Sequence, residues 1–336
     1  MSDDYLWDRS GDPDPEVERL ERILGTLAYQ PEETSLSQRL RRFPHRPAPT
    51  AVLWRLAAAI LLLVSAGAWL TGRRPLASWE VARLEGSPKV GSSRIANTAR
   101  WLIGEWLETD NASWAKVNVG AIGEIEVEPD SRLRLLETNK SQHRLSLQRG
   151  VIHVAIWAPP RLFFVETPSA VAIDLGCHYT LQVDEQGAGR LHVSSGWVAL
   201  EQQSRQSFVP SRAFCATRPG AGPGTPYFED AAETFSSALE TLDFGGAEER
   251  AAALADLLAA SREEDALTLW HLLWRVQRTE QVRIYDRLAA LYPPPAGVTP
   301  EGVLRRDVGM LDRWWNQLGL TETPWSELWS GASTAR

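Results

Sequence analysis

Cysteine is scarce in this sequence, with only Cys177 and Cys215 among 336 residues. That number excludes a disulfide-dense scaffold, a zinc finger built on cysteines and an iron–sulfur cluster. An excess of positive charge is also missing, because 43 acidic residues outnumber 35 basic ones. Nucleic-acid binding needs clustered Lys and Arg against phosphates, so we expect no direct contact with DNA or RNA.

Motifs of catalytic and cofactor sites are missing as well. The chain has no Walker loop, no dinucleotide-binding glycine fingerprint and no His-x-x-x-His or Cys-x-x-Cys pair. Ser194-Ser195 lacks the Gly-x-Ser-x-Gly elbow that presents a nucleophile. Glu124, Glu126 and Glu128 alternate as on a solvated strand face. We therefore expect no enzyme activity, no cofactor and no metal site.

One long apolar segment is present at residues 51–71, with Arg55 as its single charge. As a helix it would be ~31 Å long, which matches a hydrocarbon core of ~30 Å. Arg55 can snorkel to the interface, and Trp54 and Trp69 stand near the two ends as interface anchors do. Fifty residues precede the segment, too many for a signal peptide. We predict one transmembrane helix.

Charge bias predicts the orientation of this helix. Residues 34–50, a basic juxtamembrane linker, hold four arginines and no acid. The opposite flank is less basic, with Arg73 and Arg74 nearest to the segment. The positive-inside rule therefore places the N-terminus in the cytoplasm and everything after residue 71 outside.

Residues 1–33 form an acidic arm, with ten acids and three arginines. Asp14 and Pro15 suit the start of a short amphipathic helix. One apolar stripe follows, and with an upstream tryptophan it gives the candidate partner-binding residues Trp7, Val17, Leu20, Leu24 and Leu27. So short a helix cannot bury this stripe alone. It either docks on a cytosolic protein, lies on the membrane or pairs with its own copy.

Residues 72–228 change to a period of two. Runs such as Gly123–Glu128, Arg144–Leu147 and Tyr179–Val183 alternate polar and apolar residues, and turn signals such as Arg149-Gly150 separate them. Many short strands at this spacing predict an all-β sandwich, barrel or solenoid. No alternation of strands and helices supports a parallel nucleotide-binding sheet.

A motif series within this region resembles the FecR domain of membrane regulators of extracytoplasmic-function sigma factors. Its elements are Leu147-Gln-Arg-Gly150, the turn Thr167-Pro168, a strand that begins at Gly176, and Gly196-Trp-Val198. The resemblance implies a bacterial inner-membrane protein whose arm binds a sigma factor and whose periplasmic domain receives a signal. Cys177 stands where the family usually has Thr. Independently of the family, the three glycines suit strand starts or corners that need positive φ or close backbone approach.

The two cysteines both fall on the external side under this topology. Thiols are commonly oxidised there, so Cys177 and Cys215 are a candidate disulfide. The alternative is two buried free thiols. Cys177 and His178 are adjacent, so on a strand they would point to opposite faces and not share a metal.

Residues 229–320 predict an all-α region of four or five short antiparallel helices, for which stacked hairpins are one packing. It follows a Gly/Pro-rich linker at 218–226, and a tail occupies residues 321–336. We expect segments 228–244, 247–260 and 280–291, a capping box at Ser261–Glu264, and a last helix from Thr299 that ends before Gly319. Trp314, Trp325 and Trp329 are expected to pack internally, and the alternative is that they face a partner.

Two hypotheses of function follow. In the first, the chain is a single-pass membrane regulator of the anti-sigma kind, which holds a sigma factor inside and senses an envelope signal outside. In the second, it is an envelope scaffold or ligand-binding protein whose β domain binds a glycan or a protein, with the arm only as an anchor.

Overall fold

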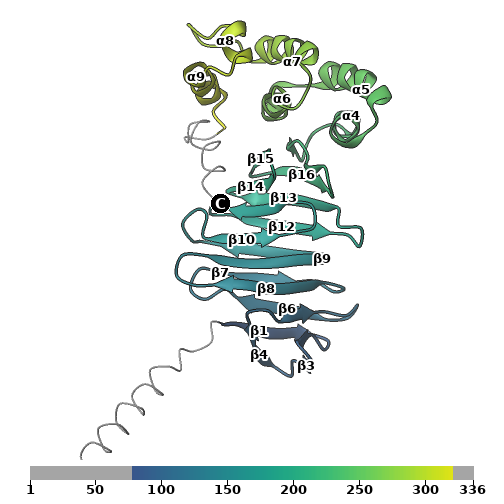
Figure 1. Ribbon diagram of the computed structural model, residues 1–336, viewed down its shortest axis with the longest axis vertical. Coiled ribbons are helices and arrows are strands. Elements are labelled where there is room, and N and C mark those ends of the chain that lie inside the picture. The colour runs from purple at the N-terminus through teal and green to yellow at the C-terminus, as the bar shows by residue number, and fades with distance from the viewer. Residues whose placement is uncertain (1–77, 321–336) are drawn as a thin grey trace, which may run out of the picture. The chain divides into compact units, whose positions relative to one another are not determined.

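The structure is a computed structural model that describes residues 78–320. The expectations for residues 1–77 and 321–336, including the arm, the apolar segment and the tail, lie outside the described residues. Every element below belongs to one compact unit of the chain. Within that unit a mostly β part is followed by a helical part, as the sequence predicts (Figure 1).

The strands form two sheets that share strand β9 (His143–Ile156). The first, sheet A, has the spatial order β4 (Thr98–Leu102), β1 (Ser78–Glu85), β6 (Trp114–Asn118), β7 (Gly123–Val127), β9, β12 (His178–Val183), β13 (Gly189–Ser195), β16 (Ala213–Arg218), with β17 (Gly222–Pro223) and β18 (Tyr227–Phe228) both on β16. The second, sheet B, has the order β3 (Ser93–Arg94), β2 (Lys89–Val90), β5 (Trp106–Glu108), β8 (Arg132–Thr138), β9, β10 (Phe163–Glu166), β11 (Val171–Asp174), β14 (Trp197–Gln202), β15 (Arg205–Pro210). The β9–β10 pairing is parallel, and the others are antiparallel.

Strand β9 passes from one sheet to the other. Its first half pairs with β8 and β10 in sheet B, and its second half pairs with β7 and β12 in sheet A. The expectation of two strands separated by a turn at Arg149-Gly150 is therefore wrong. Gly150 has φ +101°, and a Cβ there would lie 2.1 Å from Ser131 Oγ. Glycine thus permits a bend within one continuous strand, where another residue would be strained and would clash.

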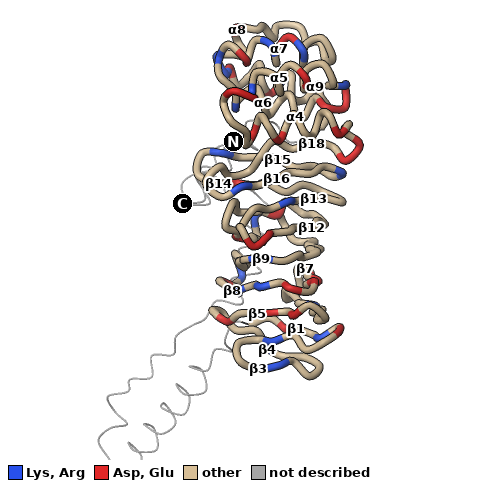
Figure 2. The backbone as a smooth tube through the Cα atoms, turned by 90° about the vertical axis from the view of Figure 1, so that its right-hand side faces the viewer, with Lys and Arg blue, Asp and Glu red and all other residues tan. Residues whose placement is uncertain are grey.

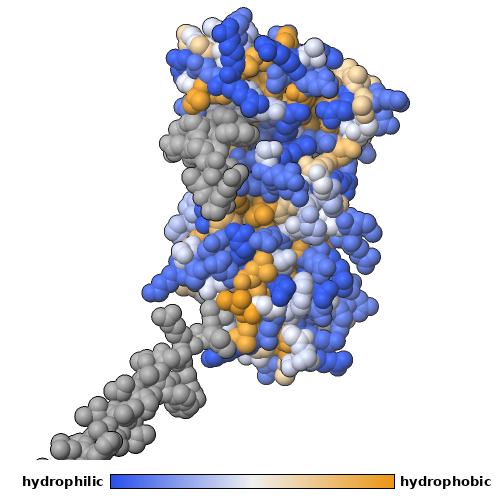
Figure 3. Space-filling view, viewed as in Figure 1, coloured by the Kyte–Doolittle hydropathy of each residue, from blue (hydrophilic) through white to orange (hydrophobic). Residues whose placement is uncertain are grey.

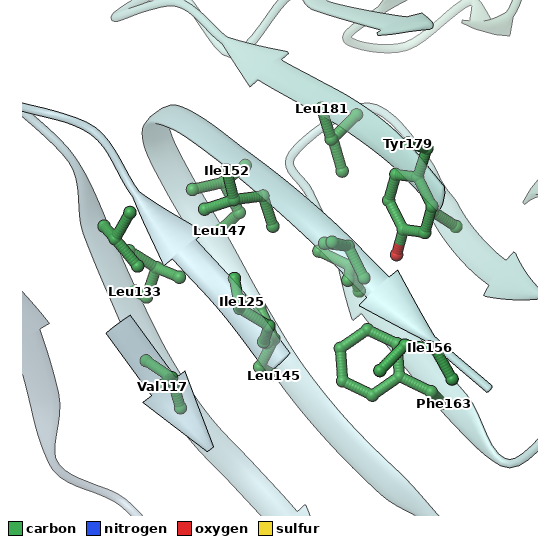
Figure 4. Packing of buried hydrophobic residues seen from close by; sticks show 14 of the residues in the cluster. Val117, Ile125, Leu133, Leu145, Leu147, Ile152, Ile156, Phe163, Tyr179 and Leu181 are labelled. Carbon is green, nitrogen blue, oxygen red and sulfur yellow. The ribbon is translucent and has the colours of Figure 1, made fainter. Parts of the chain in front are cut away.

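The inner faces of the two sheets enclose the first hydrophobic core. Alternate residues of each strand point inward, among them Val117 and Ile125 from sheet A and Leu133 and Leu145 from sheet B (Figure 4). All four are fully buried. Two sheets packed through alternating side chains make a sandwich, one of the architectures that the period of two predicts.

Four strands of sheet B are buried on both faces. In β10, Phe163 and Val165 join the core between the sheets, whereas Phe164 joins a second core made with the helices. The same division applies to β11, β14 and β15, whose outward residues Ile173, Ala199 and Phe208 also contact the helices. Consecutive residues of these strands are buried because each of their faces is covered.

The helical part contains α4 (Glu233–Phe244), α5 (Ala247–Ala260), the 3₁₀ turn η1 (Glu263–Asp265), α6 (Ala266–Leu272), α7 (Arg278–Leu291), α8 (Pro300–Leu304) and α9 (Val308–Leu318). The last helix expected from Thr299 is two helices, because Arg306 has φ +63° and Asp307 caps α9 by accepting from Met310 N. Helix α4 begins five residues later than expected, since Tyr227 and Phe228 form β18. Trp314 is fully buried in the second core, as internal packing predicts.

Two further expectations for this part are corrected. The Gly/Pro-rich stretch at 222–226 is buried and not an exposed linker, because β17 pairs with β16 and Gly224 N donates to Ala216 O at 2.7 Å. The capping box does not start at Ser261, whose hydroxyl donates back to Leu258 O. Asp265 instead accepts from Arg262 N at 2.8 Å.

Candidate binding surface

The outer face of sheet A carries a straight line of side chains, one from each of seven neighbouring strands. Strand register places each residue opposite the next, and the members, here called the cross-strand row, are Lys116, Glu126, His153, Thr180, His192, Phe214 and Tyr227. All seven are half-buried. Because strands lie ~4.8 Å apart, six steps give a row of ~29 Å.

At the middle of the row, His153 and Thr180 form a hydrogen-bonded chain with the neighbouring Glu128, which follows β7. His153 Nε2 lies 2.6 Å from Glu128 Oε1, and His153 Nδ1 lies 2.9 Å from Thr180 Oγ1. A Thr–His–Glu chain of this kind could activate a hydroxyl only beside oxyanion donors and away from water. Here the His153 and Glu128 side chains are 40% and 31% exposed on an open sheet face. The arrangement fixes the ring across three strands and is suited to binding.

One end of the row is aromatic and cationic. The His192 ring stacks on Phe214 with centroids 4.4 Å apart, and Arg190 Cζ lies 4.3 Å from the centroid of the same ring. Glu229 accepts from Arg212 Nε at 2.8 Å and lies 3.3 Å from His192 Nε2. These two hydrogen bonds lower the pKa of Glu229, so the carboxylate stays charged beside the rings. Flat rings edged by charged groups can stack with a ligand and hydrogen-bond its periphery.

The other end of the row is acidic. Lys116 Nζ lies 2.8 Å from Glu124 Oε2 and 4.0 Å from Glu126 Oε1. The hydrogen bond with Glu124 raises the pKa of Lys116. Lys116 neutralises only part of the charge of Glu124, Glu126 and Glu128, so these strands form the solvated acidic face that their alternation predicts. The row therefore changes character along its length, from carboxylates to rings.

Inside the sandwich, Asp174 is a buried carboxylate with no cation bound to it among the described residues. It is 1% exposed, and it accepts from Cys177 Sγ at 2.8 Å and from Gly176 N at 2.7 Å. Burial raises the pKa of Asp174 to about 6, although both hydrogen bonds oppose the rise. Tyr179 points into the same core (Figure 4), and its hydroxyl has no hydrogen-bond partner in the part described.

The candidate disulfide is absent, and both thiols are free and buried. Cys215 lies opposite Leu191, which lies opposite Leu181, four residues beyond Cys177. Two strand spacings of ~4.8 Å and four residues of ~3.3 Å therefore separate the two cysteines. Disulfides need Cα atoms within about 7 Å, so the register excludes the bond. His178 is exposed while Cys177 is buried, as adjacent strand positions predict.

The motif residues expected to serve folding lie at turns and close contacts. Thr167 Oγ1 accepts from Ala170 N at 3.0 Å and so holds the Thr167-Pro168 turn between β10 and β11. Gly176 and Gly196 have φ +90° and +76°, and a Cβ on Gly196 would lie 2.1 Å from Gly176 O. Val198 is fully buried between the sheets. These residues therefore stabilise the fold through a turn, positive φ or core packing, as the sequence predicts.

A buried polar network that the sequence did not reveal joins the sheets to the helices. Arg275, which follows α6, donates to Ser207 Oγ at 2.6 Å, to Gln206 O at 2.5 Å and to Thr225 Oγ1 at 2.8 Å. Asp243 of α4 accepts from Arg205 at 2.5 Å and from Thr225 N at 2.6 Å. Burial lowers the pKa of Arg275 to about 10 against the opposing effect of Asp243, so the guanidinium remains charged at neutral pH. No short-range motif marks these contacts, because their members are far apart in the chain.

A histidine strengthens the same junction. His271 Nε2 accepts from Phe208 N at 3.1 Å, while His271 Nδ1 lies 2.9 Å from Leu267 O. Burial lowers the pKa of His271 to about 3, so the ring is neutral. A backbone donor of β15 is thus satisfied by a helix side chain.

The candidate partner-binding residues Trp7, Val17, Leu20, Leu24 and Leu27 lie outside the described residues, as does the apolar segment 51–71. Between residues 78 and 320, no helix is long and apolar enough to cross a membrane. The same residues contain no cluster of three or more His, Cys, Asp or Glu that could hold a metal ion.

Comparison with known proteins gives one family match and two similar structures. A family model described as FecR protein matches residues 105–199. No curated protein gives a significant match. Two crystal structures of a protein from Parabacteroides distasonis, described as a "putative anti-sigma factor", are similar at 14% identity and a TM-score of 0.33. The matched part covers 40% of this chain and spans 63% and 62% of those chains.

The matched residues run from the turn before β5 into β14, so they include β9 and both halves of the sandwich around it. They also contain the expected motif residues Gly150, Thr167, Pro168, Gly176, Gly196 and Val198. Residues 105–199 of this chain are a FecR domain, as their Leu-x-x-Gly, Thr-Pro and Gly-x-Val motifs indicate.

Proposed function

We propose that this chain is a single-pass regulator of the bacterial inner membrane that binds an extracytoplasmic-function sigma factor through its N-terminal arm. The observation that carries the proposal is the FecR domain at residues 105–199. It follows an apolar segment of membrane-spanning length and an acidic amphipathic arm in the order that regulation across a membrane requires. Under this topology residues 72–336 lie in the periplasm.

The cross-strand row is our candidate for the surface that receives the envelope signal. It lies within and beside the FecR domain, it is open to solvent, and it offers rings at one end and carboxylates at the other. The buried network around Arg275 fixes the helices to the sheets, so a ligand on the row would meet one rigid body. Transfer of the signal then requires a change at the membrane or in the arm, and not within the sandwich.

The arm provides the decisive test. A double variant Leu20→Asp with Leu24→Asp places charges on the apolar stripe, and we expect it to abolish co-purification of the full chain with a sigma factor. The matched control Glu18→Gln with Glu21→Gln changes two neighbouring side chains off the stripe and should retain the partner. A full chain that captures no sigma factor in its native form would refute this function.

The second candidate is an envelope ligand-binding protein without a sigma-factor partner, and the stacked rings of the row favour it. Phe214→Ala would then abolish binding of a glycan or protein from the envelope, while the arm variants change nothing in the cell. Under the first function, both Phe214→Ala and the arm variants alter transcription of the same genes. Transcript profiles of the two variants therefore discriminate between the candidates.

A further inference from the structure

One end of the sandwich is not covered by other described elements. Strand β4 pairs only with β1, and β3 pairs only with β2, so both are terminal strands, while the helices lie at the opposite end (Figure 1). We call residues 86–104, which contain β2, β3, β4 and their turns, the β3–β4 end. Its exposed backbone edges and side chains are free to meet another surface.

The charge of this end differs in sign from that of the chain. Residues 86–104 include Lys89, Arg94 and Arg100, all exposed, and no acid, in a chain of net charge -8 (Figure 2). Residues 72–85 add three arginines against Glu80 and Glu85. A positive end on an acidic protein is the electrostatic signature of a contact with an anionic surface.

Three acids follow directly in the sequence, and each is engaged. Glu105 accepts from Leu102 N at 3.0 Å, and Glu108 pairs with Arg132 at 2.8 Å. Asp110 accepts from Ser113 Oγ at 2.6 Å and from Ala112 N at 3.1 Å. These two hydrogen bonds lower its pKa, with smaller effects from Lys89 and Arg94. Arg100 lies opposite Glu80 in the β1–β4 register and makes no ion pair within the described residues.

Exposed apolar side chains accompany the charges. The face of the described part seen in Figure 3 is mostly hydrophilic, with separate hydrophobic areas. Only a few large apolar side chains are strongly exposed there, and two of them belong to this end or adjoin it: Leu84 at 48% and Ile103 at 47%. Apolar side chains beside cations suit the boundary between lipid headgroups and acyl chains.

The length of the chain keeps this end close to any membrane in which residues 51–71 are inserted. Strand β1 begins at Ser78, seven residues after Thr71. At ~3.4 Å per residue, β1 starts within ~24 Å of the point where the helix leaves the hydrocarbon. Because β1 pairs directly with β4, the β3–β4 end is within the same reach.

We propose that the β3–β4 end rests on the surface of an anionic phospholipid bilayer, with Arg94 and Arg100 against the headgroups and Leu84 and Ile103 in the interface. The inference relies on the proposed insertion of residues 51–71 and adds to it a docked orientation of the external domain. The cross-strand row then stands clear of the lipid, because it crosses the strands beyond β1 in sheet A.

The test uses the full chain in nanodiscs that contain a lipid with a spin label on its headgroup. Ser92→Cys places a fluorescent probe on the turn between β2 and β3, and Ser204→Cys places one on the turn between β14 and β15 at the helical end. Both serines are exposed, and the native Cys177 and Cys215 are buried and escape labelling. We expect quenching at Ser92→Cys that is strong with phosphatidylglycerol and weak with phosphatidylcholine alone, and none at Ser204→Cys.

A charge-reversal variant is the second part of the test. One cation near an anionic surface is worth about fivefold in occupancy, so Arg94→Glu with Arg100→Glu should lower the docked-to-undocked ratio at least about twentyfold. Quenching then falls to the level seen with phosphatidylcholine alone. Arg278→Glu with Arg283→Glu makes the same change of charge at exposed positions of helix α7, at the helical end, and should preserve quenching.

Each result separates docking from anchoring. Quenching that is equal in the two lipids, or that survives the Arg94 and Arg100 reversal, overturns the inference while the chain remains in the nanodisc. A chain that alkaline carbonate releases from membranes overturns the anchoring itself. Loss of quenching only when other envelope proteins are added would assign this end to a protein partner in place of lipid and would also overturn the inference.

Discussion

Replacing Asp174 by Asn should stabilise the folded protein at neutral pH. The carboxylate lies in the core between the sheets, where it accepts from Cys177 Sγ and Gly176 N and meets no bound cation among the described residues. Asn has nearly the same shape, carries no charge at any pH, and keeps an oxygen that can accept from Gly176 N. The substitution therefore removes the cost of burying a charge and leaves the packing almost unchanged.

The size of the effect follows from the pKa. Burial raises the pKa of Asp174 from 3.8 to about 6. The folded state binds the proton more tightly than the unfolded state, so protonation favours folding, and stability is lost as the pH rises from about 4 through 6. A rise of about two pKa units corresponds to about 3 kcal/mol. The free energy of unfolding of Asp174→Asn minus that of the wild type should thus grow from near zero at pH 4 to about 3 kcal/mol at pH 8.

Urea unfolding of the full chain in a mild detergent, followed by tryptophan fluorescence across this pH range, measures the difference. Glu185→Gln removes an exposed carboxylate on the β12–β13 turn and should give no comparable trend. A difference between Asp174→Asn and wild type that stays constant from pH 5 to 8, or that favours the wild type at pH 8, would refute the reasoning. In that case the Asp174 carboxylate must be solvated or paired in a way that the structure does not contain.

Three further outcomes are expected. Gly196→Ala should lower the free energy of unfolding by at least about 2 kcal/mol, because the residue has φ +76° and a Cβ there would lie 2.1 Å from Gly176 O. Denaturant titration measures the loss. Gly220→Ala is the control, because Gly220 also has φ +76° but a Cβ there would contact nothing, so the difference between the two variants is the effect of the clash. Asp243→Ala should cost about 3–5 kcal/mol, because Arg205 and Arg275 lose their buried counter-charge, and a melting temperature equal to that of Glu240→Ala would contradict this. Native protein should not react with a thiol-specific reagent, because both cysteines are buried and burial raises their pKa, that of Cys215 to about 12. Unfolded protein should give two thiols without reductant, because no disulfide links the cysteines. A melting temperature that falls when dithiothreitol is added would contradict this, since it would reveal a disulfide.

The order of strands, turns and helices could be predicted from the sequence because each depends on local patterns. Alternation at Gly123–Val127 and His178–Val183 is visible within a few residues, and Gly319 ends α9 with φ +64° as a helix stop should. The sequence also indicated positive φ or a close backbone approach at Gly150, but it did not show that the glycine bends one continuous strand. Whether a glycine ends a strand or bends one depends on Ser131, which lies nineteen positions earlier in the chain.

Features that depend on strand register or on residues far apart in the chain could not be predicted from the sequence. Alternation places each member of the cross-strand row on one face of its own strand, and only the pairing shows that His153, Thr180 and His192 are directly opposite one another. The prediction of a disulfide was wrong for the same reason, because it relied on an oxidising compartment and not on the distance between Cys177 and Cys215. Nothing in the local sequence distinguishes Asp243 of α4, or Arg275 in the turn after α6, from exposed charges, and their burial results from the packing of the helical part on β15.

Strand β9 has a mechanical consequence for the whole sandwich. Since one uninterrupted backbone contributes hydrogen bonds to both layers, neither layer can slide or peel away without breaking the ladder of the other. Strain applied at β1 in sheet A can therefore pass to sheet B through β9. Both sheets should therefore unfold together in one cooperative transition. A force applied at the start of β1 would reach the helices without a rearrangement of one sheet against the other.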